Sequence, residues 1–382
     1  MTRTTLFAMV AACSLLAMAR ADVDKRIPQV RVSPEGAFCS LGCYDVSPES
    51  PDGTKILYMQ WTALPTSSAG GNGAVWYCNR DLTGRMKIID LRNVRIHNGG
   101  SFAWLDNQRI QVYGVWDEKK KQRGSAIVNL NGTVEHGPYL GMDVLHAPFN
   151  GQVLLSCETD GTEHGRGVFV LDTATGAVRK ICDARSFLGY TAKMPDMRDP
   201  THWRLSHPTW SRDGTLIAVC LENDSTPFGE YLFSFRPDFT DVVFFGKKPV
   251  HFNWYDDHDT IYGSDKAVQD GRPHDNSIRR WTRDGKWVED LAGSPATHCA
   301  MSPDKLWFAG ETYYDADPIL YLFRKGMPER TEIIMSHTSR KVTWNMRAHV
   351  NPTFSRDGKR LYYNRATSET LNEVWYADLS GL

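Results

Sequence analysis

Six of the twelve histidines in this sequence stand at, or a few residues before, the start of a repeated short apolar segment. Imidazole side chains bind divalent metal ions and exchange protons close to neutral pH. From the third of them onward they follow at intervals of about 45 to 50 residues, which is the length of one blade of a β-propeller. The six are His97, His146, His207, His251, His298 and His349.

The elements that must bring these histidines together are short strands joined by tight turns. His207 begins the segment His-Pro-Thr-Trp-Ser-Arg-Asp-Gly, and Asn351 begins Asn-Pro-Thr-Phe-Ser-Arg-Asp-Gly. Asp followed by Gly supports the positive φ of a hairpin turn, and a β-rich run comes after each turn. Two further strands follow, so each segment predicts a four-stranded antiparallel unit.

Weaker copies of the same pattern begin near Ser47, Phe102 and His146. Together with the four stronger copies they predict an all-β fold, a seven-bladed β-propeller of four-stranded antiparallel blades that forms a single domain over residues 22–382. The last unit lacks an obvious fourth strand. Residues 27–32 could supply it and close the ring between the two ends of the chain.

The innermost strand of every propeller blade lines the central channel, so residues at the start of these strands meet at one mouth. A single histidine at such a position more often hydrogen-bonds the ends of the backbone. The cluster of six instead predicts acid–base chemistry or a divalent metal site at the mouth, with His97 and His207 contacting the substrate.

The longest insertion, residues 183–205, joins the third and fourth units, and a long connection at a propeller mouth often binds a ligand. Within it we expect Arg204 to hold a carboxylate bidentately, Tyr190 to donate a proton and Trp203 to bind substrate. The alternative is a solvated loop whose charges have no specific partner.

Charge and composition limit the partners of this chain. The 382 residues carry 44 Lys and Arg against 45 Asp and Glu, a net charge of -1, so no overall positive field attracts nucleic acid or an anionic membrane. Residues 1–21 read as a signal peptide, which predicts a secreted or periplasmic protein, and no later segment is apolar enough to span a membrane. Seven cysteines remain after residue 21, and Cys157 and Cys182 could form a disulfide.

Four motifs in the second half of the chain resemble, in the same order, those of the oligogalacturonate lyases, which are secreted or periplasmic propellers related to the TolB-like repeat proteins. The resemblance covers residues 207–379. Its motifs are His251-Phe-Asn-Trp, His298-Cys-Ala-Met-Ser, Asp317-Pro-Ile-Leu-Tyr-Leu-Phe and, preceded by Ser336-His-Thr-Ser, His349-Val-Asn-Pro-Thr-Phe-Ser.

Members of that family cleave uronic-acid polymers by β-elimination with a bound manganese ion. The resemblance implies that His251 is catalytic and that His298, His349 and Asn351 are metal-binding positions, Asn351 standing where the family has a histidine. The family's metal-binding Gln falls on Met346 and its catalytic Arg near Glu230, so half of the family's site has changed. Because the family binds manganese, the resemblance implies manganese as the divalent ion. Zinc and calcium are left open.

Propeller ulvan lyases use His, Tyr and Arg instead, and His146, Tyr190 and Arg204 could form a similar set. β-Elimination needs a positive group to neutralise the uronate carboxylate, a base for the C5 proton and an acid for the leaving O4. We therefore predict a secreted lyase acting on an anionic polysaccharide or oligosaccharide, with His251 or His146 as the base. The alternatives are a non-catalytic TolB-like propeller that binds carbohydrate or protein, and a glycosidase that uses water.

Overall fold

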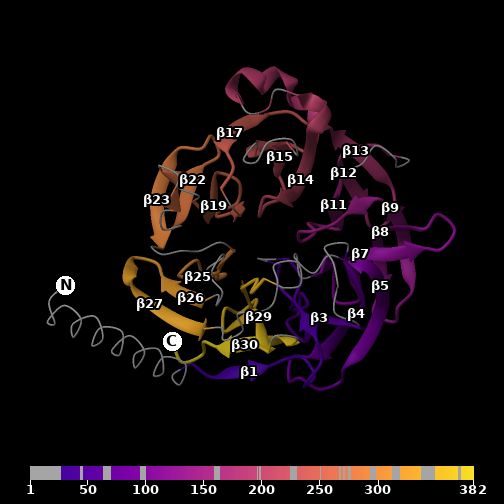
Figure 1. Ribbon diagram of the computed structural model, residues 1–382, viewed down its shortest axis with the longest axis vertical. Helices are drawn as coiled ribbons and strands as arrows, with labels where there is room; N and C mark the ends of the chain where they lie inside the picture. Colours follow the sequence, from indigo (N-terminus) through magenta and orange to yellow (C-terminus); the bar gives the residue numbers. More distant parts are fainter. Residues whose placement is uncertain are drawn as a thin grey trace, which may run out of the picture.

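The computed structural model of the chain is a ring of seven four-stranded antiparallel sheets around a central channel, which confirms the predicted fold (Figure 1). The structure describes residues 27–43, 46–62, 70–94, 100–158, 164–195, 197, 199–223, 230–249, 251–265, 268–269, 272–273, 277–292, 298–311, 319–336, 349–368 and 371–382. The predicted signal peptide, residues 1–21, lies outside them, and so does His97.

The blades follow one another along the chain, and in each the strands run from the channel outward. Blade 1 is formed by β2 (Cys39–Ser40), β3 (Lys55–Trp61), β4 (Gly71–Asn79) and β5 (Met86–Val94). Blade 2 is formed by β6 (Phe102–Trp104), β7 (Arg109–Asp117), β8 (Gln122–Asn129) and β9 (Val134–Leu140). Blade 3 is formed by β10 (Met142–Asp143), β11 (Gln152–Cys157), β12 (Gly167–Asp172) and β13 (Val178–Cys182).

The remaining blades repeat this order. Blade 4 is formed by β14 (Trp203–Trp210), β15 (Ile217–Asn223), β16 (Glu230–Phe235) and β17 (Val243–Lys247). Blade 5 is formed by β18 (Phe252–Trp254), β19 (Thr260–Ser264), β22 (Ile278–Thr282) and β23 (Trp287–Ala292), with the two-stranded ribbon of β20 (Val268–Gln269) and β21 (Arg272–Pro273) inserted after β19. Blade 6 is formed by β24 (Cys299–Met301), β25 (Trp307–Glu311), β26 (Ile319–Arg324) and β27 (Met327–Ser336).

Blade 7 joins the two ends of the chain, as the sequence predicts. It contains β28 (Thr353–Phe354), β29 (Arg360–Ser368) and β30 (Leu371–Asp378), and its outermost strand is β1 (Gln29–Arg31). β1 pairs antiparallel with β30, with Val30 opposite Tyr376, and Figure 1 shows the two strands side by side at the bottom of the ring. Main-chain hydrogen bonds between distant parts of the chain therefore close the propeller.

The turn after each inner strand shows why the repeated Ser-Arg-Asp-Gly sequence folds as it does. In blade 4 the Ser211 hydroxyl donates to Asp213 Oδ1 at 2.8 Å, and the same carboxylate accepts from the Thr215 amide at 3.1 Å. Gly214 has a φ of +71°, and a Cβ there would lie 2.1 Å from the Phe149 ring of blade 3. Glycine is therefore needed both for the turn and for the contact between blades.

The core lies between neighbouring blades. Every residue of β15 is buried, because apolar side chains from both adjacent sheets cover its two faces. Within the described part of the chain no helix is long and apolar enough to cross a membrane. Cys157 and Cys182, which the sequence suggests as a disulfide, are both buried and are not joined by one.

Candidate functional site

A cavity of about 370 Å³ opens where the inner strands begin. Among the described residues, polar side chains from blades 2 to 7 line it, and Cys43, which follows β2, lines it from blade 1. A second cavity, of about 480 Å³, lies where the same strands end and is lined by residues such as Trp210, Met301 and Phe354. We call the first one the mouth cavity. Its charged and imidazole-bearing residues are Arg123, Asp143, Glu158, Arg204, His207, Glu222, Glu230, Lys248, His251 and His298.

Three of the predicted histidines line the mouth cavity, together with Asn351. His207 and Asn351 occupy the same place in blades 4 and 7, and both have left-handed backbone angles, with φ of 52° and 46°. In blade 4 this residue interrupts the pairing of β14 with β15 between Ser206 and Thr209. Such strained positions are uncommon away from glycine, and they cluster at functional sites.

His146 lies elsewhere. It is buried, lines the cavity at the opposite end of the inner strands, and its ring centroid is 6.1 Å from that of His207. Burial, helped by the charge of His207, lowers the pKa of His146 to about 3. The structure therefore does not bring His146 into the mouth cavity, where a base for the predicted reaction is required.

His298, Glu311 and His349 form a buried cluster beside the mouth cavity. Glu311 ends β25 and faces His298 across the β24–β25 pair, while His349 comes from the connection that leads into blade 7. Glu311 Oε1 contacts Nδ1 of His298 and lies 3.4 Å from Nδ1 of His349. The ring of His298 also lies against those of His349 and His251, at centroid distances of 4.4 and 3.9 Å.

The donor set of this cluster fits a divalent metal ion. One ligand atom from each of the three residues lies within 4.8 Å of the others, and imidazole with carboxylate is a usual ligand set for manganese or zinc. Glu311 Oε2 is buried and has no hydrogen-bond partner among the described residues, which leaves one carboxylate oxygen for a ligand. Burial would raise the pKa of Glu311, but His298 and His349 outweigh it and lower that pKa to about 2, so the carboxylate is ionised.

Asn351, the third position that the resemblance implies for a metal, also lines the mouth cavity. Its side-chain amide donates to the carbonyl of Gly42 at 3.2 Å. Glu311 was missed by the sequence reasoning, although an acid that ends an apolar strand opposite a candidate histidine is a signal that an antiparallel register would reveal.

Arg204 is brought to the mouth cavity, but carboxylates of the protein already hold its guanidinium. Its Nε donates to Glu222 Oε2 at 2.9 Å, and its Nη1 donates to Glu158 Oε2 at 3.2 Å. Lys248 completes the network, with Nζ 3.5 Å from Glu222 and 3.2 Å from Glu230. The predicted role of Arg204 in holding a substrate carboxylate thus competes with two internal ion pairs.

The same network sets the protonation of its members. Burial would raise the pKa of Glu222, but Lys248 and the other positive partners outweigh it and lower that pKa to about 2. Burial lowers the pKa of His207 to about 4, so its ring is neutral at pH 7 and its Nδ1 lies 2.9 Å from the Ser206 hydroxyl. A neutral His207 suits hydrogen bonding to an uncharged sugar hydroxyl better than charge neutralisation.

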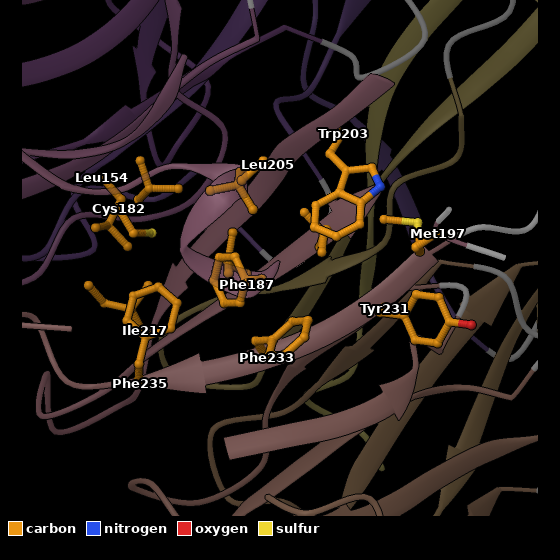
Figure 2. Packing of buried hydrophobic residues seen from close by; sticks show 14 of the residues in the cluster. Leu154, Cys182, Phe187, Met197, Trp203, Leu205, Ile217, Tyr231, Phe233 and Phe235 are labelled. Atoms are coloured by element: carbon orange, nitrogen blue, oxygen red, sulfur yellow. The ribbon is translucent and has the colours of Figure 1, made fainter. Parts of the chain in front are cut away.

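Tyr190 and Trp203 do not reach the mouth cavity. The insertion that carries them forms two 3₁₀ segments, η1 (Ala184–Lys193) and η2 (Pro200–His202), at the outer edge of blades 3 and 4, at the top of Figure 1. The Tyr190 ring packs against Phe233 and Phe244, with centroid distances of 5.2 and 6.0 Å, and its hydroxyl donates to the Val242 carbonyl. Trp203 is 1% exposed and packs within the cluster drawn in Figure 2.

The physical reason is apolar burial. Phe187, Met194 and Met197 of the insertion are buried, and the Phe187 ring is tilted against that of Phe233 at a centroid distance of 4.5 Å, so the segment packs onto the blades (Figure 2). The structure therefore places Tyr190, the predicted acid, and Trp203, the predicted substrate contact, in a packing segment and does not bring them to the mouth cavity.

We expect Tyr190→Phe to leave any eliminating activity unchanged, because the hydroxyl lies outside the mouth cavity. Loss of a catalytic acid would instead lower the rate about 10²-fold or more. The variant loses one hydrogen bond, so its free energy of unfolding should fall by about 1 kcal/mol or less. Initial rates on uronic polymers and urea unfolding curves of the two proteins check this, and a rate loss near 10²-fold would show that the hydroxyl acts on the substrate.

The mouth cavity also contains a tyrosine–arginine pair that the sequence reasoning did not single out. Tyr113 comes from β7 and Arg123 from β8. Arg123 Nε donates to the Tyr113 hydroxyl at 2.8 Å, and the guanidinium lies 5.0 Å from the centre of that ring. Strands β7 and β8 of blade 2 thus supply the tyrosine and the arginine that the sequence predicts at the mouth from the insertion.

Comparison with known proteins shows the fold alone. The sequence matches no protein-family model and no curated protein. An oligogalacturonate lyase from Vibrio parahaemolyticus is 13% identical, with a TM-score of 0.41 over 92% of this chain and 93% of that one. The β-propeller domain of the Trilobed protease from Pyrococcus furiosus is 13% identical, with a TM-score of 0.53 over 89% and 93%. A prolyl endopeptidase is 13% identical, with a TM-score of 0.57 over 98% of this chain and 51% of that one.

Proposed function

We propose that this protein is a polysaccharide lyase that cleaves a uronic-acid-containing polysaccharide or oligosaccharide, of ulvan or oligogalacturonate type, by β-elimination in the mouth cavity. The observation that carries the proposal is the meeting there of His251, the cations Arg123 and Lys248, and the adjoining His298–Glu311–His349 cluster. The motif resemblance assigns the catalytic histidine and two metal-binding histidines to residues that do lie together.

The reaction divides among these groups by their chemistry. His251 takes the C5 proton of the uronate, because an imidazole ring can act as a general base. Arg123, from the edge of the cavity, pairs with the uronate carboxylate and so makes that proton more acidic. A divalent ion held by His298, Glu311 and His349 would supply further stabilisation of the charge that develops on the carboxylate.

The proposal extends to the whole chain. Residues 1–21 direct export, residues 22–382 form the single propeller domain, and the partner is an anionic polysaccharide or oligosaccharide outside the cytoplasm. No part of the proposal involves nucleic acid or a membrane span.

The product gives a direct test. Elimination leaves an unsaturated uronate that absorbs in the ultraviolet, so the purified protein is incubated with ulvan, polygalacturonate and other uronic polymers while the absorbance is followed. Parallel samples contain a chelator, or the chelator followed by excess manganese or zinc. The proposal is supported if the absorbance rises with the untreated protein, stays flat with chelator and rises again after metal is added. It is contradicted if the absorbance stays flat on every polymer with either metal.

A second candidate function is a non-catalytic propeller that binds carbohydrate or protein in the same cavity. The observation that favours it is the internal pairing of Arg204 and Lys248 with Glu222, which leaves less positive charge for a substrate. In that case calorimetry would show binding of an oligosaccharide while the absorbance stays flat. A glycosidase would release new reducing ends without the absorbance.

A further inference from the structure

The proposed elimination needs a proton donor for the leaving O4, and Tyr190 lies too far out to serve. The mouth cavity offers another proton-bearing group. Asp143 lies at the end of β10, the innermost strand of blade 3, and its register opposite Ser156 matches that of Arg204 opposite Glu222 in blade 4. Both side chains therefore come from the same level of the channel and line the same cavity.

The hydrogen bonding of Asp143 sets it apart from the other acids of the cavity. Glu158 and Glu222 accept from Arg204, and Glu230 pairs with Lys248, so each of these three carboxylates has a cation as its partner. Asp143 Oδ1 is buried and has no hydrogen-bond partner among the described residues. A buried carboxyl oxygen without a donor is more stable when the group carries its proton.

The surroundings of Asp143 act in the same direction. Burial is the largest influence and the nearby carboxylate of Glu158 adds to it, while the Val144 amide, Arg123 and the Ser101 hydroxyl oppose it. Together they raise the pKa of Asp143 to about 7. A pKa near 7 means that a large share of Asp143 groups hold a proton at neutral pH.

We propose that Asp143 is the general acid of the β-elimination, giving its carboxyl proton to O4 of the departing sugar. This inference rests on the proposed function. As His251 takes the C5 proton, the electron pair of that C–H bond forms the C4=C5 double bond and the C4–O4 bond breaks. The proton of Asp143 then forms the new O4–H bond, and solvent reprotonates the aspartate as His251 releases its own proton.

The test compares wild type with Asp143→Asn, which keeps the shape of the side chain but has no acidic proton. On the polymer that wild type cleaves, we expect kcat to fall about 10²-fold or more with KM little changed, because the acid acts in the transition state. The wild-type rate should fall as pH rises through about 7, where Asp143 loses its proton, and this alkaline limb should be absent in the variant. Asp257→Asn, at an exposed position in a turn, is the matched control. It should keep the wild-type rate and the fall of that rate at alkaline pH.

A substrate with a better leaving group separates an acid from a merely structural residue. On a uronate that carries a 4-nitrophenyl ether at O4, the leaving group is 4-nitrophenolate, which departs without protonation. Asp143→Asn should therefore cleave this substrate within a few-fold of the wild-type rate, whereas a misfolded variant would not. Asp143→Glu, which restores the acid, should recover part of the activity on the polymer.

The outcomes distinguish this inference from the function on which it rests. If wild type shows no elimination on any polymer, the proposed function itself is wrong. Asp143 is not the acid if wild type is active and Asp143→Asn is equally active. The same conclusion follows if the variant loses activity on the natural and the activated substrate to the same extent.

Discussion

Replacing His251 with Asn is expected to lower kcat on the uronic polymer by about 10²- to 10⁴-fold, with KM little changed, because the substituted amide cannot take the C5 proton. The structure fixes the main chain at His251. The His251 carbonyl accepts from the Ser264 amide at 3.0 Å, and a Cβ on Gly263 of β19 would lie 2.2 Å from that carbonyl oxygen. The close approach that only glycine allows places the ring against His298, at a centroid distance of 3.9 Å.

The matched control for this variant is His258→Asn. His258 lies in the same blade, but it is exposed in the turn after β18, where its Nδ1 is 2.6 Å from the Asp213 carboxylate. Its replacement should leave kcat unchanged, and ultraviolet initial rates for the three proteins give the comparison. Equal rates for His251→Asn and wild type would remove His251 from the reaction.

Glu222→Gln is expected to lower the free energy of unfolding at pH 7 by about 3 to 5 kcal/mol, because it leaves Lys248 and Arg204 short of a buried counter-charge. The Glu222 side chain is 8% exposed and that of Lys248 is 9% exposed, so water does little to replace the lost carboxylate. The depression of the Glu222 pKa from its ordinary value of 4.5 to about 2 corresponds to about 3 kcal/mol. The free energy that corresponds to the pKa shift thus agrees in size with the expected loss of stability. Urea unfolding of wild type and Glu222→Gln measures that loss.

Glu230→Gln provides the comparison within the same network. Glu230 also pairs with Lys248, at 3.2 Å, but its side chain is 42% exposed, so its loss should lower the free energy of unfolding by about 1 kcal/mol or less. A larger loss for Glu230→Gln than for Glu222→Gln would contradict the assignment of Glu222 as the centre of the network.

The effect of Glu222→Gln should depend on pH with a definite sign. The pKa of this carboxyl is lower in the folded protein than in the unfolded chain, so its stabilisation is complete above about pH 4.5 and disappears as the pH falls through about 2. The stabilities of wild type and variant should therefore converge between pH 4.5 and pH 2. A gap that stays constant over this range would mean that packing, and not charge, accounts for the loss.

The fold could be predicted because its signals are local and repeated. The Ser-Arg-Asp-Gly turn of blade 4 depends on hydrogen bonds within the five residues from Ser211 to Thr215, and on one glycine. The alternation of apolar residues after each turn needs no knowledge of the rest of the chain. The closing strand was predictable for a related reason, since a blade with one strand missing needs an edge partner, and β1 is the strand left over at the other end.

The placement of the insertion between blades 3 and 4 could not be predicted from its sequence, because the same residue types serve packing and binding. A tyrosine and a tryptophan in a long connection suit a sugar, but here they are drawn into a cluster with Phe187, Phe233 and Met197. The amount of apolar surface that the neighbouring blade exposes decides between the two outcomes, and the insertion's own residues do not contain that information.

By itself, then, the sequence determined the seven blades, the closure of the ring, and the histidines that stand at the start of the inner strands. The tertiary structure alone decided that His251, His298 and His349 lie together while His146 faces the other end of the channel, and that Glu311 joins the histidines. It also decided that Asp143 lines the mouth cavity with its Oδ1 buried and without a hydrogen bond among the described residues. The reason is that turns and strand alternation depend on neighbours in the chain. Which side chains meet in a cavity depends instead on strand register and on the packing of blades about 50 or more residues apart.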